Sequence, residues 1–474
     1  MDHSMDPYVK SPYDNLVIYN VYVRNHSKNG TFADVKDDLK RIQSMGVDYI
    51  WLLPIHPIGK VKRKGTLGSP YSITNYREIN PEFGTLDDFR DLVNAIHDLK
   101  MKIMLDVVFN HTAHDCEWIH THPQWYYRDK NGQPTAKVAE WSDIVDLEFR
   151  GNEHDLWPEL IDSLKYWIEQ GVDGFRMDVA SSVPIEFWKL ARSELLKLKP
   201  NVLLLAESTR LIYIEGHTRK NEYVNTDAVL YQAFDLCYDY DLYQVWRAAM
   251  AAAVPIKMYL ELVRLQNSIY PRNFCKLRFV ENHDQERIAK ICKNNRVKGL
   301  AWTAFTSFNK GTFLLHGGQE TENTTTSSLF EKDYVDCKSI YSLGKFMTKL
   351  IQIKKHPVVQ TGRFVLTHHS PCIVGIWEDE VSKEGLIGVF NVEQIAKQDD
   401  ELEISNLPDG TYQNLLIDLG LKGENTYEQD VEINVKNGKL KVPQLACILH
   451  YKQLILDPQV FYSDIFDFNY RGGM

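Results

Sequence analysis

Apolar strands alternate with amphipathic helices over roughly the first 370 residues of the chain. In the first unit an apolar run at 16–23 precedes a helical pattern. Thr31 and Asp34 have the spacing of a capping box, which predicts the start of the helix, and Gly46 is typical of its end. The runs that we expect to be strands cover residues 16–23, 49–53, 103–109, 172–177, 202–206, 228–230, 277–281 and 312–316. Eight strands, most followed by a helix, predict an α/β fold of the (β/α)8 TIM-barrel type rather than an open doubly wound sheet.

Two segments depart from this alternation. A long insertion at 111–155, after the third expected strand, is dense in Trp, Tyr and His, and loops of this length are usually functional. From about residue 366 the apolar period becomes two, with turn signals at Pro408-Asp409-Gly410 and Asn437-Gly438, which predicts a C-terminal antiparallel β-sandwich domain. The strands expected there cover 364–367, 372–377, 385–390, 431–435 and 440–451. The predicted parts are the first part of the barrel at 1–110, subdomain B at 111–155, the rest of the barrel at 156–365 and the β domain at 366–474.

Charge and composition argue against several classes of protein. The 54 basic and 64 acidic side chains give a formal net charge of −10 and a pI near 5.9, which argues against a nucleic-acid partner. No run approaches ~18 uninterrupted apolar residues, so we expect no membrane partner. Residues 1–14 lack the apolar core of a signal peptide, and the seven cysteines are scattered without a CxxC pair. We therefore expect a globular cytoplasmic protein with reduced thiols.

Acidic residues lie at the carboxyl ends of several expected strands. Asp178, Glu207 and Asp284 are far apart in sequence, but the strand ends of a barrel converge on one mouth. Arg176 lies two residues before Asp178, so both side chains point to the same face of the strand. A single acid at such a place usually caps a helix or pairs with a cation. The coincidence of four strand ends, with Asp106 as the fourth acid, favours a catalytic site.

This set of residues suits the chemistry of a sugar acetal. The departing oxygen needs a proton, and the anomeric carbon needs a nucleophile or a counter-charge. Asp178 beside Arg176 is the natural ionised nucleophile, and Glu207 is the natural proton donor because neighbouring negative charge raises a carboxyl pKa. Carboxyl groups about 5–5.5 Å apart would retain the anomeric configuration, whereas about 6.5–9.5 Å would invert it.

Four segments follow one another at these strand ends: DVVFNH at 106–111, GFRMD at 174–178, the end of the strand at Glu207, and ENHD at 281–284. In order and spacing they resemble the signature regions of the α-amylase family of glycoside hydrolases (family 13). The resemblance covers most of the chain, including the insertion and the C-terminal domain. It implies a barrel that acts on α-glucans by a retaining mechanism.

The resemblance also implies a role for each matching residue. Asp178 matches the catalytic nucleophile, Glu207 the general acid/base, and Asp284 the third carboxylate, which stabilises the transition state. His111 and His283 match histidines that bind the sugar, and Tyr71 matches a tyrosine that stacks on the reacting ring. Arg176 matches the arginine that lies beside the nucleophile, and Asp106 matches a supporting acid with a structural role.

The sequence departs from the family pattern after the nucleophile. Many α-amylases carry there a Lys-His pair that contacts substrate and supports calcium, whereas this chain has Ser181 and Ser182. Val179 is more similar to the neopullulanase, cyclomaltodextrinase and oligo-1,6-glucosidase members. Asn110 and Asp146 match positions that bind Ca²⁺ in many amylases, and oxygen ligands suit that ion. The alternative is that Asn110 has only a hydrogen-bonding role.

We therefore expect a retaining hydrolase of α-1,4 glucosidic bonds in maltodextrins or starch fragments. Because Val179 is similar to the residue found in those other members, an α-1,6-acting glucosidase or a transglycosylase of the same family is the alternative. A non-catalytic sugar-binding barrel is a third interpretation, but such members have typically lost an acid that this chain retains. Aromatic rings of the insertion either line outer sugar subsites or pack the insertion onto the barrel; they are Trp118, Trp125, Tyr126, Tyr127 and Trp141.

Overall fold

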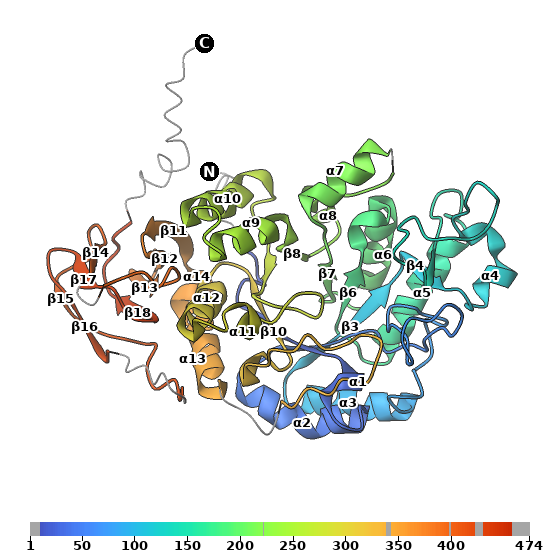
Figure 1. Ribbon diagram of the computed structural model, residues 1–474, viewed down its shortest axis with the longest axis horizontal. Helices are drawn as coiled ribbons and strands as arrows, with labels where there is room; N and C mark the ends of the chain where they lie inside the picture. The colour runs from blue at the N-terminus through green and yellow to red at the C-terminus, as the bar shows by residue number, and fades with distance from the viewer. Residues whose placement is uncertain (1–9, 221, 338–342, 398–399, 422–429, 457–474) are drawn as a thin grey trace, which may run out of the picture.

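The computed structural model describes residues 10–220, 222–337, 343–397, 400–421 and 430–456. Its centre is a closed barrel of parallel strands, in the order β1-β10-β9-β8-β7-β6-β3-β2, with helices packed around it (Figure 1). The strands are β1 (Val17–Val21), β2 (Tyr49–Leu52), β3 (Lys102–Val108), β6 (Gly174–Asp178), β7 (Leu203–Ala206), β8 (Leu236–Tyr238), β9 (Lys276–Arg278) and β10 (Thr312–His316). This barrel confirms the predicted (β/α)8 fold.

Local sequence sets the helix boundaries. Thr31 and Asp34 form the predicted capping box at the start of α2 (Phe32–Ser44), and the same motif begins α3 (Leu86–Asp98). The other helices are α1 (Val23–His26), α4 (Trp118–Thr121), η2 (Pro123–Trp125), α5 (Leu156–Glu169), η3 (Ala180–Ser182), α6 (Ile185–Leu198), α7 (Leu211–Arg219), α8 (Asp227–Leu230), α9 (Tyr240–Met250), α10 (Ile256–Ile269), α11 (Ile288–Ile291), α12 (Arg296–Phe308), η4 (Gln319–Thr321), α13 (Gly344–Lys354) and α14 (Pro357–Thr361). Within the described residues, no helix has both the length and the apolar character that crossing a membrane requires.

One expected barrel strand is wrong. Residues 228–230 belong to α8, in which the Leu230 N–H donates to the Thr226 carbonyl at 3.0 Å. The sixth strand is instead β8, which lies further along the chain. A three-residue apolar run has no periodicity that separates a strand from a helix. The other seven expected strands overlap observed ones.

A small insertion lies between β3 and β6 and stands beside the barrel (Figure 1). Its antiparallel ladder joins β4 (His111–Ala113) to β5 (Ile144–Asp146), with His111 opposite Asp146. Because β4 begins just after β3 ends, the insertion stands at the carboxyl ends of the barrel strands. This position places it next to any site at the barrel mouth.

Antiparallel sheets follow the barrel, as predicted. A four-stranded sheet has the order β11-β12-β13-β18, and two-stranded ladders pair β14 with β17 and β15 with β16. Their bounds are β11 (Arg363–His369), β12 (Cys372–Asp379), β13 (Glu384–Phe390), β14 (Glu401–Glu403), β15 (Gly410–Gln413), β16 (Glu432–Val435), β17 (Lys439–Lys441) and β18 (Ala446–Tyr451). The Trp377 indole N–H donates to the Phe308 carbonyl at 2.9 Å and so fixes the larger sheet to α12. The single strand expected at 440–451 is two strands, because Pro443 between them lacks a ladder N–H.

Candidate active site

Three carboxyl groups reach the barrel mouth from three different strands. Asp178 is the last residue of β6, and Glu207 directly follows β7. Asp284 lies in the segment after β9, where its N–H donates to the Asn282 side-chain oxygen at 2.9 Å. The side chains of Glu207 and Asp284 are 16% and 34% exposed, so both stay accessible to a substrate.

Arg176 connects the carboxyl groups of three neighbouring residues. Its fully buried guanidinium places Nη1 2.8 Å from an oxygen of Asp178 and 2.8 Å from an oxygen of Asp106. Its Nη2 lies 3.1 Å from Oε1 of Glu207. The predicted nucleophile and the predicted proton donor therefore flank a single guanidinium. Charge-assisted hydrogen bonds of this kind stabilise an ionised carboxylate beside it.

Glu207 has the electrostatic environment of a proton donor. Burial raises the pKa of Glu207 to about 8, and the nearby charges of Asp178 and Asp284 act in the same direction against Arg176. Among the described residues one backbone group supports its charged form: the Val179 N–H donates to Oε2 at 2.8 Å. The raised pKa favours the protonated form of the Glu207 carboxyl near neutral pH.

A tyrosine and a histidine form one wall of the mouth. The Tyr71 hydroxyl donates to Asp106 Oδ2 at 3.0 Å and lies 2.7 Å from Nε2 of His283. The two rings are stacked, with centroids 5.8 Å apart and planes 14° apart. Burial lowers the pKa of His283 to about 4, which favours the neutral imidazole. Burial also raises the pKa of Asp106 to about 7.

The remaining predicted residues join the same network. His283 Nε2 lies 3.2 Å from Oδ2 of Asp284, and His111 Nε2 lies 3.2 Å from the Tyr71 carbonyl oxygen. The ring of Trp141, from the insertion, lies 5.9 Å from that of His111. All eight residues singled out in the sequence are thus linked by contacts in one place. Their individual roles in a reaction stay predictions.

Two residues that contact Arg176 were not predicted from the sequence. The Arg176 Nε–H donates to the Tyr238 hydroxyl at 3.2 Å, and the Trp51 ring lies 5.5 Å from the guanidinium carbon. Trp51 also packs edge-on against His283, with centroids 5.6 Å apart. Tyr238 was missed because its strand was placed at 228–230. Trp51 stands in an apolar run that carries no sign of a polar neighbour.

The backbone is strained next to the nucleophile position. Val179 has φ 45° and ψ 38°, in the left-handed region that a β-branched residue rarely adopts. This conformation turns its N–H toward Glu207. Strain of this kind persists only where the surroundings hold it, and it is concentrated at functional sites.

The two residues matched to a calcium position satisfy each other. The Asn110 amide N–H donates to Oδ1 of Asp146 at 3.2 Å, and the Lys137 N–H donates to Oδ2 at 2.9 Å. Burial raises the pKa of Asp146, which disfavours the charged form that calcium needs. The described residues contain no cluster of three or more His, Cys, Asp or Glu able to hold a metal. In this arrangement both Asp146 oxygens accept protein hydrogen bonds, which does not fit a bound calcium ion.

Aromatic residues of the insertion divide into two groups. Trp125 and Tyr126 are buried, and Trp118 is stacked on Tyr76 with centroids 5.2 Å apart, so these rings pack the insertion onto the barrel. Trp141 is partly exposed and lies beside His111. Tyr127 is also partly exposed, with the Lys137 ammonium 5.0 Å from its ring centroid, and a role of either ring in binding substrate stays a prediction.

The fold and site define a class: (β/α)8-barrel proteins with a carboxylate trio at the carboxyl ends of the strands. Comparison with known proteins is more specific. Residues 22–355 match the family model described as the alpha amylase catalytic domain, and the chain belongs to the α-amylase family.

Solved structures and relatives agree with this membership. An alpha-amylase from Lactobacillus plantarum is 36% identical, with a TM-score of 0.85, over 93% of this chain and 99% of that chain. A maltogenic alpha-amylase from Thermotoga neapolitana is 32% identical, with a TM-score of 0.79, over 94% of this chain and 100% of that chain. An alpha-1,4-glucan:maltose-1-phosphate maltosyltransferase from Rhodospirillum rubrum is 37% identical over 199 residues, which are 38% of this chain but only 28% of that protein.

Proposed function

We propose that the protein is a retaining α-glucan hydrolase that cleaves α-1,4 glucosidic bonds of maltodextrins or starch fragments by double displacement. One observation carries the proposal: Arg176 holds the Asp178 carboxylate and the Glu207 carboxyl side by side, while burial raises the pKa of Glu207 to about 8. A proton-donating carboxyl group beside a second carboxyl group is the pair that acid-assisted glycoside cleavage needs, and retention is what the resemblance to the family implies.

Each group then has one task. An Asp178 oxygen attacks the anomeric carbon while Glu207 gives its proton to the departing glycosidic oxygen, which leaves a covalent glycosyl-enzyme. Glu207, now ionised, takes a proton from water, and that water displaces Asp178 from the anomeric carbon. Asp284 and the neutral His283 hold sugar hydroxyl groups, and Asp284 adds negative charge near the positive transition state.

Transfer is the second candidate, and the relatives motivate it. A sugar hydroxyl in place of water at the second step would lengthen a glucan instead of shortening one. The 199-residue similarity to a maltosyltransferase supports this alternative, and the similarity to alpha-amylases over nearly the whole chain supports hydrolysis. Val179, directly after Asp178, keeps α-1,6 cleavage as a third outcome of the test.

Product analysis separates these functions. The purified protein is incubated with maltoheptaose, panose, isomaltose and a cyclic α-glucan, and the products are resolved by chromatography. We expect shorter maltooligosaccharides from maltoheptaose, released first as α-anomers. Products longer than the substrate, especially with maltose 1-phosphate as donor, would establish transfer. Glucose from isomaltose alone would establish α-1,6 cleavage.

Two further arms complete the experiment. Tight maltodextrin binding without new reducing ends would identify a non-catalytic barrel and overturn the proposal. A chelator arm tests the calcium prediction, and we expect unchanged rates because Asn110 and Asp146 bond to each other. A loss of rate that added Ca²⁺ restores would contradict that expectation.

A further inference from the structure

Two loop segments close one side of the barrel mouth by binding each other. We call them the rim segments: residues 63–69, which precede Tyr71, and residues 328–335, which follow β10. The Leu67 N–H donates to the Phe330 carbonyl at 3.1 Å. The Thr66 N–H donates to Oε1 of Glu331 at 2.8 Å, and the Thr66 hydroxyl donates to the other carboxylate oxygen.

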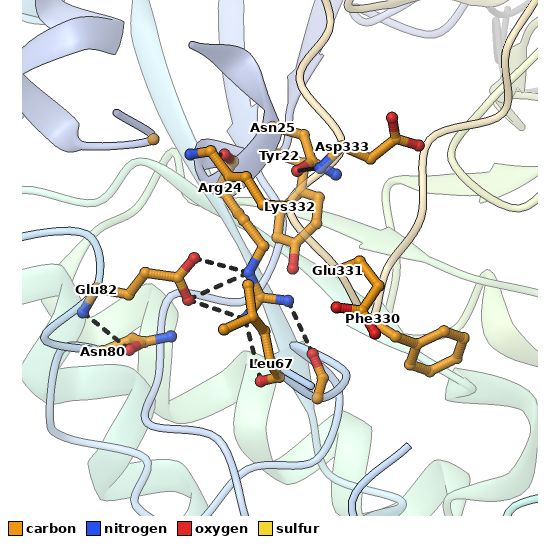
Figure 2. Close-up of polar contacts among 12 residues, drawn as sticks. Tyr22, Arg24, Asn25, Leu67, Asn80, Glu82, Phe330, Glu331, Lys332 and Asp333 are labelled. Carbon is orange, nitrogen blue, oxygen red and sulfur yellow. Dashed lines mark hydrogen bonds and ion pairs between the residues drawn. The ribbon is translucent and has the colours of Figure 1, made fainter. Parts of the chain in front are cut away.

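Arg24, in the short helix α1, lies between these segments (Figure 2). Its side chain is fully buried, and its Nη1 donates to the Gly68 carbonyl at 2.8 Å and to the Leu329 carbonyl at 3.1 Å. Nη2 donates to the Leu67 carbonyl at 3.3 Å, and Nε and Nη2 bind Glu82 at 2.8 and 2.9 Å. Each nitrogen of the guanidinium is therefore bonded, and both rim segments receive one or more of these bonds.

The next residue extends the same connection. The Asn25 amide donates to the Ser328 carbonyl at 2.8 Å and accepts from the Asp333 N–H at 2.9 Å. Glycine permits the close approach of the two rim segments: Gly65 has φ 65°, and a Cβ there would lie 2.7 Å from the Phe330 Cβ. The contact is thus specified at several positions of the sequence.

The first rim segment leads directly to Tyr71, and the second lines a cavity that His283 also lines. Gly68 is three residues before Tyr71, whose N–H donates to the Ser69 hydroxyl oxygen at 3.2 Å. Leu329 and His283 line the same cavity of about 30 Å³, and within the described residues Nδ1 of His283 has no hydrogen-bond partner. Arg24 therefore binds the segment that runs into Tyr71 and, through the Leu329 carbonyl, the segment that shares a cavity with His283.

We propose that Arg24 is a positioning residue, which fixes Tyr71 and His283 by holding the two rim segments together. This inference rests on the proposed function, because the reaction that it serves is the one at Asp178. The guanidinium does not contact the reacting groups. Only arginine offers five donors in a planar fork, so lysine would keep the charge and lose most of the carbonyl contacts.

The test compares Arg24→Lys with Arg278→Lys. Arg278 is also a buried, ion-paired arginine, but it binds Asp239 at 2.6 Å and the Lys310 carbonyl at 2.9 Å, before β10 begins. We expect Arg24→Lys to lower kcat/KM on maltoheptaose by about tenfold or more, because small misplacements of binding groups are costly. Arg278→Lys should lower Tm without lowering kcat/KM more than about threefold. Equal losses of kcat/KM in the two variants would overturn the proposal.

A double-variant cycle identifies the route of the effect. Tyr71→Phe removes the hydroxyl that binds Asp106 and His283. In the Tyr71→Phe background, Arg24→Lys should cost less than about threefold, because the two changes share one effect. If the kcat/KM losses of the two single variants multiply in the double variant, Arg24 does not act through Tyr71 and the proposal is overturned.

Hydrogen exchange keeps the inference separate from the proposed function. Arg24→Lys should raise amide exchange in residues 64–72 and 328–335 together, whether or not the wild type degrades α-glucans. Unchanged exchange in either segment would overturn the proposal. If Arg24→Lys does not fold, Glu331→Gln weakens the same contact at the surface, and the same rise in both segments is expected. An inactive wild type with the expected exchange would contradict the function alone.

Discussion

Two of the buried groups of charged side chains in the described part of the barrel differ in how their charges are compensated. The mouth cluster comprises Asp106, Arg176, Asp178 and Glu207, and the wall cluster comprises Asp227, Asp241 and Lys276. In each cluster a fully buried cation lies between carboxyl groups. Tyr238 touches both clusters, through its hydroxyl to Arg176 and through its carbonyl to Lys276.

Both acids of the wall cluster receive hydroxyl donors in addition to the lysine. In the wall cluster, Asp241 accepts from the Tyr270 hydroxyl at 2.7 Å, and Asp227 accepts from the Ser208 hydroxyl at 3.1 Å. Burial acts to raise the pKa of Asp241, but Lys276 and these hydrogen bonds outweigh it and the pKa is lowered. Burial still raises the pKa of Asp227 to about 6.

At the mouth, three carboxyl groups share a single guanidinium. Glu207 also accepts from the Val179 N–H, and its pKa rises to about 8 through burial and the neighbouring carboxylates. The pKa values of both wall acids thus stay below neutrality, whereas at the mouth burial raises the pKa of Asp106 to about 7 and that of Glu207 to about 8. A surplus of negative charge, rather than burial alone, makes a proton donor.

The largest difference between the clusters should appear in catalysis. Asp178→Asn removes the proposed nucleophile but keeps its shape, so we expect kcat/KM on maltoheptaose to fall by about 10⁴-fold or more. Tm should not fall, because the change removes a charge from a site with surplus negative charge. Near-normal rates on every α-glucan tested would show that Asp178 is not the nucleophile.

A substitution in the wall cluster should instead lower the stability of the fold. Lys276→Met leaves Asp227 and Asp241 buried without their cation, and we expect the free energy of unfolding to fall by about 3–5 kcal/mol at pH 7. Urea denaturation measures the loss, and the folded fraction should keep kcat/KM within about tenfold. A stability loss below about 1 kcal/mol would contradict the assignment of a structural role.

This contrast also shows what the sequence could predict. The mouth acids stand at strand ends within recognisable segments, so their convergence followed once the barrel was predicted. Tyr238 was missed because the β8 strand is only three residues long and a similar apolar run precedes it. The contacts of Arg24 were not predictable, because they join backbone carbonyls 44 and 305 residues away that have no side-chain signature.

The pH dependence of the mouth cluster tests the surplus-charge argument. Glu207 must be protonated to act as an acid, so kcat/KM should fall as pH rises through its pKa of about 8. The Asp284 carboxylate raises that pKa, and Asp284→Asn should therefore move the alkaline limb to lower pH. The residual rate of this variant is followed from pH 5 to pH 10. An unchanged limb, or a move to higher pH, would contradict the electrostatic account.

The smallest effect is expected at the strained Val179. Val179→Gly relieves a left-handed conformation that costs about 1–2 kcal/mol, but glycine also gains freedom in the unfolded chain worth about 0.4–1 kcal/mol. We expect stability within about 1 kcal/mol of wild type and a kcat lower by about threefold, because the N–H that fixes Glu207 becomes less rigid. Lys100→Gly is the matched control: Lys100 has φ 62° at the exposed end of α3, so its replacement should leave kcat unchanged. If both variants change kcat equally, the Val179 backbone has no special role, and the mouth owes its proton donor to side-chain charges alone.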